Sequence, residues 1–192
     1  IERRSKPLSN FSEMSFGNMP NDGGGLILSE SERDELLLKH PKAKKYIRIL
    51  LGADEFIKGT KRYCLWIENE DKYEAASIPF IVNRINKTKG HRLSSKDKGT
   101  NKLANRPHQF RDTKVGKNNQ IIIPSATSAR RKYIPIGFLE KEIIISNLAL
   151  VIYDTQPYLM SVVSSNIHMV WVKSIGGRLG TGYRYSKDII FN

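Results

Sequence analysis

Residues 143–153 read IIISNLALVIY. Two short apolar runs, rich in β-branched residues, are separated only by Ser146 and Asn147, which predicts two strands joined by a short connection. Residues 120–123 (QIII) and 133–138 (YIPIGF) are two further predicted strands. Most of the predicted helices come before these strands along the chain. This order predicts an α+β fold with a mixed, mostly antiparallel sheet and N-terminal helices.

The N-terminal part of the chain predicts a linker followed by helices. Residues 1–25 end in the turn sequence PNDGGG, and residues 26–192 are predicted to form one domain. Ser29, with Glu32 three positions later, predicts a capping box that opens a helix ending near His40. Pro41 predicts a second helix that stops at Gly52. Further helices are predicted over 75–86 and 158–165, and a last strand runs through Ile190.

Composition limits the class of protein. The chain has 192 residues, of which 39% are hydrophobic, so one packed domain is expected. No apolar run approaches the roughly 18 residues that a membrane span needs, and the N-terminal residues do not resemble a signal peptide. Cys64 is the single cysteine, which excludes an internal disulfide and a cysteine-based zinc site. We expect Cys64 to be a buried strand residue and the protein to work in a reducing cytosol.

The positive charge is concentrated in one quarter of the chain. The net charge is +13, and fourteen Lys and Arg face only two acids between Arg84 and Lys132. So uneven a distribution favours a polyanionic partner over a solvated basic face. Nucleic acid is favoured over a membrane, because this stretch has no long amphipathic helix with a bulky apolar face. Residues 87–117 are polar with little periodicity, and we expect them to be mobile without a partner.

No catalytic constellation is recognisable in the sequence. The histidines have no paired metal-ligand spacing, and no Gly-x-Ser-x-Gly motif is present. Acidic residues cluster in the helix that follows Ser29, where their negative charges interact favourably with the positive N-terminal end of the helix dipole. The basic quarter has only Asp97 and Asp112, too few for a metal-dependent nuclease site. We therefore predict no catalytic residue and no metal ligand in this chain.

Residues 168–186, HMVWVKSIGGRLGTGYRYS, combine glycine with basic residues and contain no acid. Three interpretations are open: a plain β-hairpin with solvated arginines, a loop that binds phosphate, and a surface that contacts nucleic acid. In the hairpin, Gly180 and Gly182 would be turn residues with positive φ. We expect His168 and Trp171 to lie in or near the core.

Eight ordered stretches resemble one family. They are PLSNFSEMSFGNMPNDGGGLILSESERDELL, KYIRILLGADEFIKG, RYCLWI, LANRPHQF, RRKYIPIGFL, ISNLALVIYD, HMVWVKSIGGRL and YRYSKDIIFN. The chain resembles the MmeI-like proteins, type IIL restriction endonuclease–methyltransferases (within type IIG) that methylate adenine N6. The resemblance covers essentially the whole chain and implies a target recognition domain, which follows the methyltransferase domain and reads double-stranded DNA. Residues 1–25 would then be the linker from that upstream domain.

The resemblance also implies where the chemistry lies. The family's nuclease, its S-adenosylmethionine loop and its Asn-Pro-Pro-Tyr adenine site lie upstream, so this chain is expected to be catalytically silent. S-adenosylmethionine, and Mg²⁺ for cleavage, are implied for the longer protein only. The family's base-reading segment corresponds to Gly180, Thr181, Gly182, Tyr183 and Arg184. Two of these positions are glycine, where other members have longer side chains.

The residues themselves predict a division of labour. Gly176 and Gly177 would let the backbone approach DNA closely, and Arg184 would bond to guanine in the major groove. Small hydroxyls beside arginines suit phosphate contacts, and the basic residues nearby would add to them. The predicted phosphate-binding residues are Arg92, Lys96, Ser125, Ser128, Arg130, Arg131, Lys132, Lys173 and Arg178. An RNA-binding or ribosome-associated protein and a free-standing nuclease remain alternatives.

Overall fold

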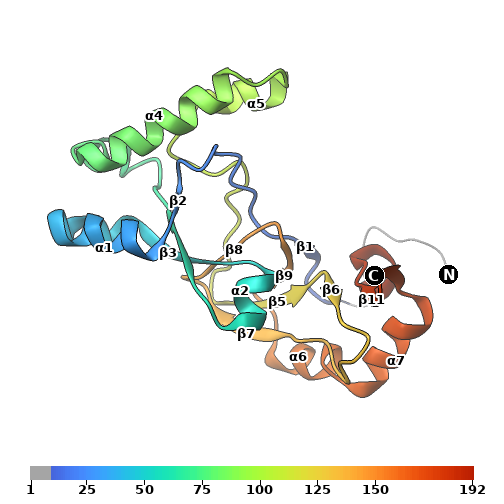
Figure 1. Cartoon of the computed structure of the whole chain (residues 1–192). Coiled ribbons are helices and arrows are strands. Elements are labelled where there is room, and N and C mark those ends of the chain that lie inside the picture. The colour runs from blue at the N-terminus through green and yellow to red at the C-terminus, as the bar shows by residue number, and fades with distance from the viewer. Residues whose placement is uncertain (1–9) are drawn as a thin grey trace. The chain divides into compact units, whose positions relative to one another are not determined.

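The computed structural model describes residues 10–192, which divide into two compact units. Unit 1 consists of residues 10–17, 52–59 and 115–192. Unit 2 consists of residues 18–51 and 60–114. Both units combine antiparallel strands with helices (Figure 1). The predicted α+β class with antiparallel pairing is therefore confirmed.

Unit 1 is built on a four-stranded antiparallel sheet. Its strand order is β1 (Met14–Phe16), β9 (Ala149–Tyr153), β5 (Asn119–Pro124) and β7 (Gly137–Glu140). The central strands β5 and β9 are almost entirely buried, as expected for the apolar runs that predicted them. The short strand β8 (Ile144–Ile145) precedes β9. Unit 1 also contains the short helix α2 (Ala53–Lys58).

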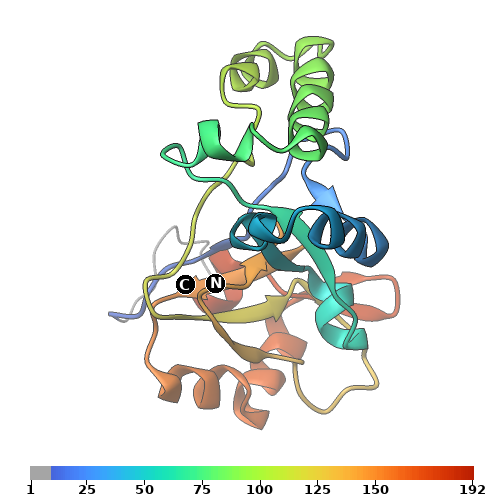
Figure 2. The ribbon, with the colours of Figure 1, turned by 90° about the vertical axis from the view of Figure 1, so that its left-hand side faces the viewer.

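Two helices cover one face of this sheet. Both α6 (Pro157–Val163) and α7 (Asn166–Ile175) lie beneath the strands in Figures 1 and 2. Leu159 and Val163 of α6 belong to the same core cluster as Met169 and Val172 of α7 and two isoleucines of β5, Ile121 and Ile123. The helix predicted over 158–165 is thus confirmed, with bounds shifted by one or two residues.

The chain ends in a smaller sheet and a helical turn. The smaller sheet has the order β10 (Gly177–Leu179), β11 (Gly182–Arg184) and β6 (Ala126–Thr127), with antiparallel pairing throughout. The π-helical turn η3 (Lys187–Phe191) follows, so the predicted last strand through Ile190 is wrong. The chain coils there because Ile190 turns inward to the core cluster and bonds helically to Ser186.

Unit 2 contains an antiparallel arrangement of β2 (Ile27–Leu28), β4 (Arg62–Leu65) and β3 (Ile47–Leu51). Before β3 come α1 (Glu30–Lys39) and the 3₁₀ helix η1 (Pro41–Tyr46). After β4 come α3 (Lys72–Ala75), α4 (Pro79–Leu93), α5 (Lys98–Lys102) and the 3₁₀ turn η2 (Leu103–Asn105). Cys64 is a buried strand residue, as predicted.

The helices of unit 2 show which local sequence signals were sufficient to predict where a helix begins and ends. The capping box of Ser29 and Glu32 is present at the start of α1, as predicted. The second predicted helix is wrong beyond Tyr46, because residues 47–51 form the strand β3, of which residues 47–50 pair with β4. β-branched isoleucines at 47 and 49 favour a strand once a partner is available. The helix predicted over 75–86 exists, but it begins at Pro79 and continues to Leu93.

Residues 14–25 contribute to the folded units. Met14–Phe16 pair with β9, and Asp22 accepts hydrogen bonds from the backbone amides of Gly24, Leu26 and Ile27. Residues 1–9 of the predicted linker lie outside the described residues. That this segment connects to an upstream methyltransferase domain stays a prediction. Within the described residues, no helix is long and apolar enough to span a bilayer.

Candidate nucleic-acid interface

The glycine-rich stretch forms the end of a helix and a β-hairpin. His168 lies within α7, which ends at Ile175 with Gly176 as its C-cap, and the hairpin comprises only Gly177–Arg184. A side chain at Gly176 would lie 2.4 Å from the Val172 carbonyl oxygen, so this glycine is required by the helix end. Gly180 has a φ of +56° in the turn between the strands, which suits glycine. Of the two predicted positive-φ glycines, only Gly180 is confirmed.

The two arginines of the hairpin lie on opposite faces. Arg178 is paired with Tyr183, and residues directly opposite each other on antiparallel strands share a face. The guanidinium carbon of Arg178 lies 4.2 Å from the centre of the Tyr183 ring, in cation–π contact. Arg184 is paired with Gly177 and Ala126, so it projects from the other face. The glycine opposite Arg184 leaves its exposed side chain unobstructed.

Arg184 borders a cavity of about 320 Å³ that is lined by both polar and apolar residues. Its lining residues come from β1, from the position between β5 and β6, from the end of β11 and from the segment that follows it: Phe16, Ser125, Arg184, Tyr185, Ser186, Lys187, Asp188 and Ile189. Lys187 and Asp188 form an ion pair of 2.5 Å. Sequence reasoning did not identify Phe16, Lys187 or Asp188. The one sequence feature that could have indicated Lys187 and Asp188 is that this charged pair follows Arg184 closely in the chain.

A partly buried polar pair supports this wall of the cavity. The ring Nε2 of His168 and the hydroxyl of Tyr185 lie 2.9 Å apart, which connects α7 to the segment after β11. Burial lowers the pKa of His168 and raises the pKa of Tyr185, because it disfavours both charged forms. His168 is therefore near the core, as predicted. Trp171 remains 43% exposed, although its ring N–H donates to the Ile190 carbonyl.

The lowered pKa of His168 predicts acid sensitivity. Folding excludes a proton that the unfolded chain accepts below about pH 6.5, so stability is complete above that pH and decreases as the pH falls. Burial also lowers the pKa of His108, which adds to the effect. We expect the free energy of unfolding of His168→Gln to decrease less between pH 7.5 and pH 5 than that of the unaltered protein. Thermal melts at both pH values test this, and identical losses would contradict it.

The basic loop between β6 and β7 is exposed. Ser128 accepts hydrogen bonds from the amides of Arg130, through its hydroxyl, and of Arg131, through its carbonyl. The side chains of Arg130, Arg131 and Lys132 are directed to solvent. Ser125 is half-buried, and its carbonyl accepts from the amide of Tyr185. Lys173 is exposed on α7 rather than on the hairpin. These six residues all belong to unit 1.

Arg92 of unit 2 is fully buried, which contradicts its predicted contact with phosphate. Its guanidinium donates to five backbone carbonyls, those of Pro20, Asn21, Leu103, Arg106 and Gln109, at 2.7–3.2 Å. It therefore fastens α4 to the turn before β2 and to the segment after α5. Part of the basic stretch expected to be mobile is thus helical and internally bonded. Lys96, between α4 and α5, is exposed.

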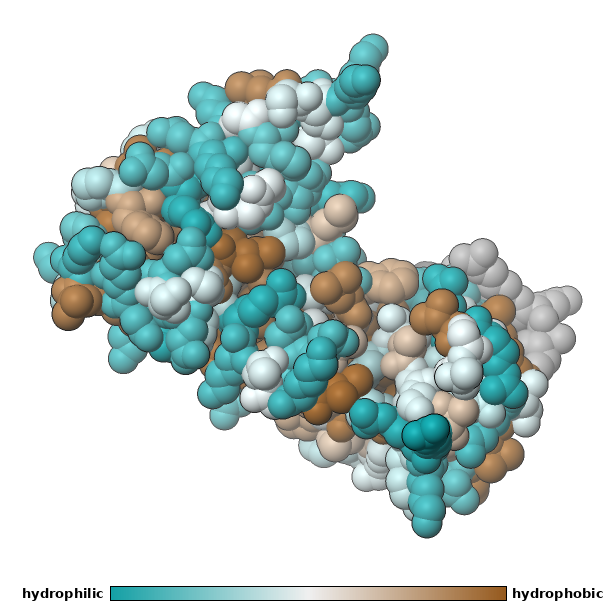
Figure 3. Space-filling view, viewed as in Figure 1, coloured by the Kyte–Doolittle hydropathy of each residue, from teal (hydrophilic) through white to brown (hydrophobic). Residues whose placement is uncertain are grey.

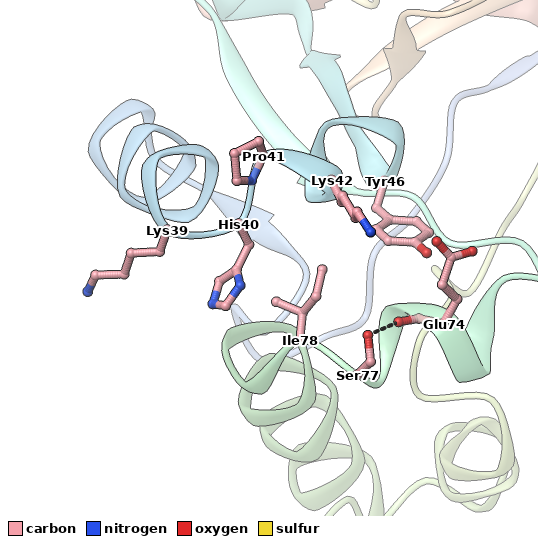
Figure 4. Close-up of a pocket in the computed structure, with 8 residues that line it drawn as sticks. All are labelled: Lys39, His40, Pro41, Lys42, Tyr46, Glu74, Ser77 and Ile78. Carbon is pink, nitrogen blue, oxygen red and sulfur yellow. Dashed lines mark hydrogen bonds between the residues drawn. The ribbon is translucent and has the colours of Figure 1, made fainter.

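Unit 2 has a second cavity, of about 310 Å³, shown in Figure 4. It is lined by the end of α1, by η1 and by the residues before α4: Lys39, His40, Pro41, Lys42, Tyr46, Glu74, Ser77 and Ile78. The Ser77 hydroxyl donates to the Glu74 carbonyl. Lys45 pairs with Glu74 and Asp71 beside it. Among residues 10–192, no cluster of three His, Cys, Asp or Glu side chains is placed to hold a metal ion.

The comparisons with known proteins point to one family, and the similarity extends over the whole chain. The family model described as "MmeI, target recognition domain" matches residues 1–192. The chain belongs to the MmeI target recognition domain family. It is 47% identical to "DNA methyltransferase A" of Bacillus subtilis (strain 168), over 100% of this chain and 22% of that protein. The chain thus spans about a fifth of the length of this curated relative.

A solved structure shares the fold of this MmeI-family chain. It is described as the type IIL restriction–modification enzyme MmeI in complex with DNA. The two match with a TM-score of 0.91 and 34% identity, over 99% of this chain and 25% of that one. The α+β architecture described above is therefore that of the MmeI target recognition domain.

The structure separates the five predicted base-reading positions of this MmeI-family chain. Gly180 forms the turn with a positive φ, and a side chain at position 182 would lie 2.5 Å from the Thr127 carbonyl oxygen. The backbone therefore explains why both positions are glycine. Tyr183 is buried in the core cluster and supports Arg178. Thr181 at the turn and Arg184 at the cavity have exposed side chains. These two are the positions of the five whose side chains are free to contact a ligand.

Proposed function

We propose that this chain reads double-stranded DNA for a restriction–modification methyltransferase. The single observation that carries the proposal is the hairpin, which presents an unobstructed Arg184 beside a cavity. Membership of the MmeI target recognition domain family and the likeness to an enzyme solved with DNA support it. Arginine bonds guanine O6 and N7 through two parallel donors, the most common specific contact in the major groove.

The proposed mechanism divides positioning from reading. Arg130, Arg131, Lys132, Ser125, Ser128, Lys173 and Arg178 contact phosphates in unit 1, and Lys96 does so in unit 2. Such contacts fix the register of a protein on the duplex and carry no direct sequence information. Arg184 and Thr181 contact base edges. Arg92 is not part of this proposed set, because its guanidinium is occupied inside unit 2.

The proposed chemistry of the full-length protein lies outside this chain. Methyl transfer to adenine N6 from S-adenosylmethionine, and cleavage with Mg²⁺, belong to domains that the described residues do not include. This chain contributes by holding the duplex so that one adenine is placed at the methyltransferase site. The methyltransferase domain of the same polypeptide is accordingly its proposed partner besides DNA.

A selection from random duplexes tests the proposal. The full-length protein is incubated with them at two salt concentrations, and bound sequences are read out. We expect one enriched motif of a few base pairs that contains an adenine, with affinity that decreases as salt increases. Salt-sensitive binding without a motif, or tighter binding to structured RNA, would contradict the proposal.

The contact between Arg178 and Tyr183 predicts a graded pair of variants. Tyr183→Phe keeps the aromatic face, whereas Tyr183→Leu keeps an apolar but smaller side chain in the core cluster and removes the face on which the guanidinium lies. A cation–π contact contributes about 0.5–1 kcal/mol at an exposed site, so we expect Tyr183→Leu to bind DNA roughly two- to fivefold more weakly. Tyr183→Phe should bind like the unaltered protein. Equal affinities for the two variants would show that Tyr183 does not position Arg178.

A further inference from the structure

Helices α6 and α7 carry apolar residues on two sides. Their inward sides belong to the core cluster described above. Their outward sides are apolar as well, and in Figure 3 hydrophobic residues reach the surface over α7. A helix that is apolar all round is normally covered on every side. The outward residues are 43–84% exposed, and we call them the α6/α7 face: Tyr158, Val162, Ile167, Val170 and Trp171.

The exposed residues of α7 form a regular stripe. Ile167, Val170 and Trp171 are spaced i, i+3 and i+4, which places them on one side of the helix. Ser174 continues the stripe, and its hydroxyl donates to the Val170 carbonyl within the helix. Single apolar residues scattered over a surface are normal, whereas a contiguous apolar patch marks an interaction site. The spacing therefore indicates a partner on this side of α7.

A cavity of about 300 Å³ joins the exposed sides of the two helices. Val162 of α6 and Trp171 of α7 both line it, together with residues 190–192 at the end of the chain. His168 also lines it, and its ring Nε2 is already bonded to the Tyr185 hydroxyl. The other lining residues are mainly apolar. A pocket of this kind accepts an apolar side chain that anchors a protein partner.

The α6/α7 face lacks charge in a chain that is otherwise rich in it. Residues 155–172 contain no Asp, Glu, Lys or Arg, although 27% of the whole chain is charged. With about 100° per residue, the next charged residue, Lys173, falls outside the stripe. DNA fits such a surface poorly, because cations bind its phosphates. A membrane also fits poorly, since interfacial helices carry basic residues beside their apolar side. An uncharged protein surface is the partner that fits.

The full-length polypeptide supplies such a surface at this place. The chain covers 22% of the curated relative and 25% of the solved MmeI chain, so most of each protein lies outside the matched part. Phe11 and Asn192 lie near the two ends of the described residues, and both line the cavity. A domain joined at either end is therefore tethered close to the α6/α7 face. Such a tether gives the domain a high effective concentration there.

The α6/α7 face is directly connected to the proposed base-reading hairpin. No linker separates α7 from β10, because Gly176 is the C-cap of α7 and Gly177 begins β10. The bond between His168 and Tyr185 ties α7 to the residue that follows Arg184. A domain that docks on α7 is thus connected to Arg184 through a short stretch of chain and a hydrogen bond.

We propose that the α6/α7 face is the docking surface for the methyltransferase domain of the full-length protein. An apolar side chain of that domain enters the cavity between Val162 and Trp171. Docking on α7 sets the distance from Arg184 to the methyltransferase site, so the base pairs that are read determine which adenine is presented. The identity of the docked domain rests on the proposed function, whereas its presence rests on the α6/α7 face itself.

Two matched tyrosines of unit 1 measure whether the face is covered. Tyr158 is 56% exposed on the face, and Tyr133 is 54% exposed in the loop before β7. The full-length protein without DNA is oxidised with hydroxyl radicals, and both modified tyrosines are quantified by mass spectrometry. We expect Tyr158 to react roughly fivefold more slowly than Tyr133, because the core of an interface is desolvated. Equal reactivity would overturn the docking surface.

A cross-link identifies what covers the face. A photoreactive amino acid replaces Val170 in the full-length protein, and the peptides linked to it after irradiation are sequenced. We expect a link within one polypeptide to a peptide of the methyltransferase domain. A product of doubled mass would show that a second copy covers the face, and a link to any other domain would equally overturn the assignment.

Ile167→Glu tests what the docking does. Ile167 is 84% exposed, and an acid suits the first turn of α7, so unit 1 should stay folded. In the full-length protein the carboxylate would have to be desolvated in the interface. We expect methylation to fall roughly tenfold while affinity for DNA stays within about twofold.

Leu38→Lys is the matched control for Ile167→Glu. Leu38 is 83% exposed, and a base suits the last turn of α1, so neither methylation nor DNA affinity should change. Equal methylation by the two variants would overturn the role of docking. A protein that protects Tyr158 but selects no DNA sequence would overturn the proposed function and leave the covered face standing.

Discussion

Replacing Arg92 with methionine is expected to lower the free energy of unfolding of unit 2 by about 3–5 kcal/mol. The guanidinium donates to five carbonyls that belong to three separate segments: the turn before β2, the η2 region and the loop after it. Methionine fills a similar volume but leaves these buried acceptors without a donor. Loss of hydrogen bonds from a charged donor accounts for the size of the effect.

Tryptophan fluorescence isolates this effect, because the chain has two tryptophans, Trp66 in unit 2 and Trp171 in unit 1. In a Trp171→Phe background, Trp66 packs against Phe110 at 5.5 Å between ring centres and reports on unit 2 alone. Denaturant titration then gives the stability of each variant. The stability of Arg92→Lys should lie between those of the unaltered protein and of Arg92→Met, because an ammonium group has fewer donors than a guanidinium and lacks its planar geometry.

Lys96→Met is the matched control for Arg92→Met. Lys96 lies in the same basic segment, but its side chain is exposed. The free energy of unfolding of Lys96→Met should therefore stay within about 0.5 kcal/mol of that of the unaltered protein. Limited trypsin digestion adds a second readout, because loss of the Arg92 contacts should make residues 94–114 more accessible to cleavage. If Arg92→Met is as stable as Lys96→Met, the five hydrogen bonds do not organise this segment.

Arg184→Ala is expected to remove discrimination at one base pair. A bidentate contact from arginine to guanine contributes about 1–3 kcal/mol, so affinity for the preferred sequence should fall roughly 5- to 150-fold. Sequences that lack this base pair should be bound almost as before. Stability should change little, since Arg184 is exposed and its strand partner Gly177 leaves it free of side-chain packing.

Arg130→Ala provides the contrast for Arg184→Ala. Arg130 lies in an exposed loop and is proposed to contact phosphate, so its loss should weaken binding to all sequences equally. The slope of log affinity against log salt should also decrease by about one. Competition binding with the selected sequence and its single-base variants distinguishes the two outcomes. An equal loss on every sequence from Arg184→Ala would exclude base reading by that residue.

Local signals in the sequence were sufficient for several elements. The apolar runs at 120–123 and 148–153 became β5 and β9, because a continuous apolar segment can be satisfied only between two covered faces. The capping box at Ser29 depends on residues three positions apart and needed no tertiary information. The family resemblance rested on ordered blocks spread over the whole chain, and the family match confirms it.

The sequence by itself therefore determined the fold class, the family and the basic character of one quarter of the chain. Tertiary structure alone decided what individual residues do. Residues 47–51 have helical spacing, yet β4 offers them a strand partner. In the sequence, Arg92 has the features of a cation at the surface. Its burial is favourable only because backbone carbonyls from distant parts of the chain surround the guanidinium and accept its hydrogen bonds. Tyr183 and Arg184 are neighbours, and the pleat of β11 sends one into the core and the other to the cavity.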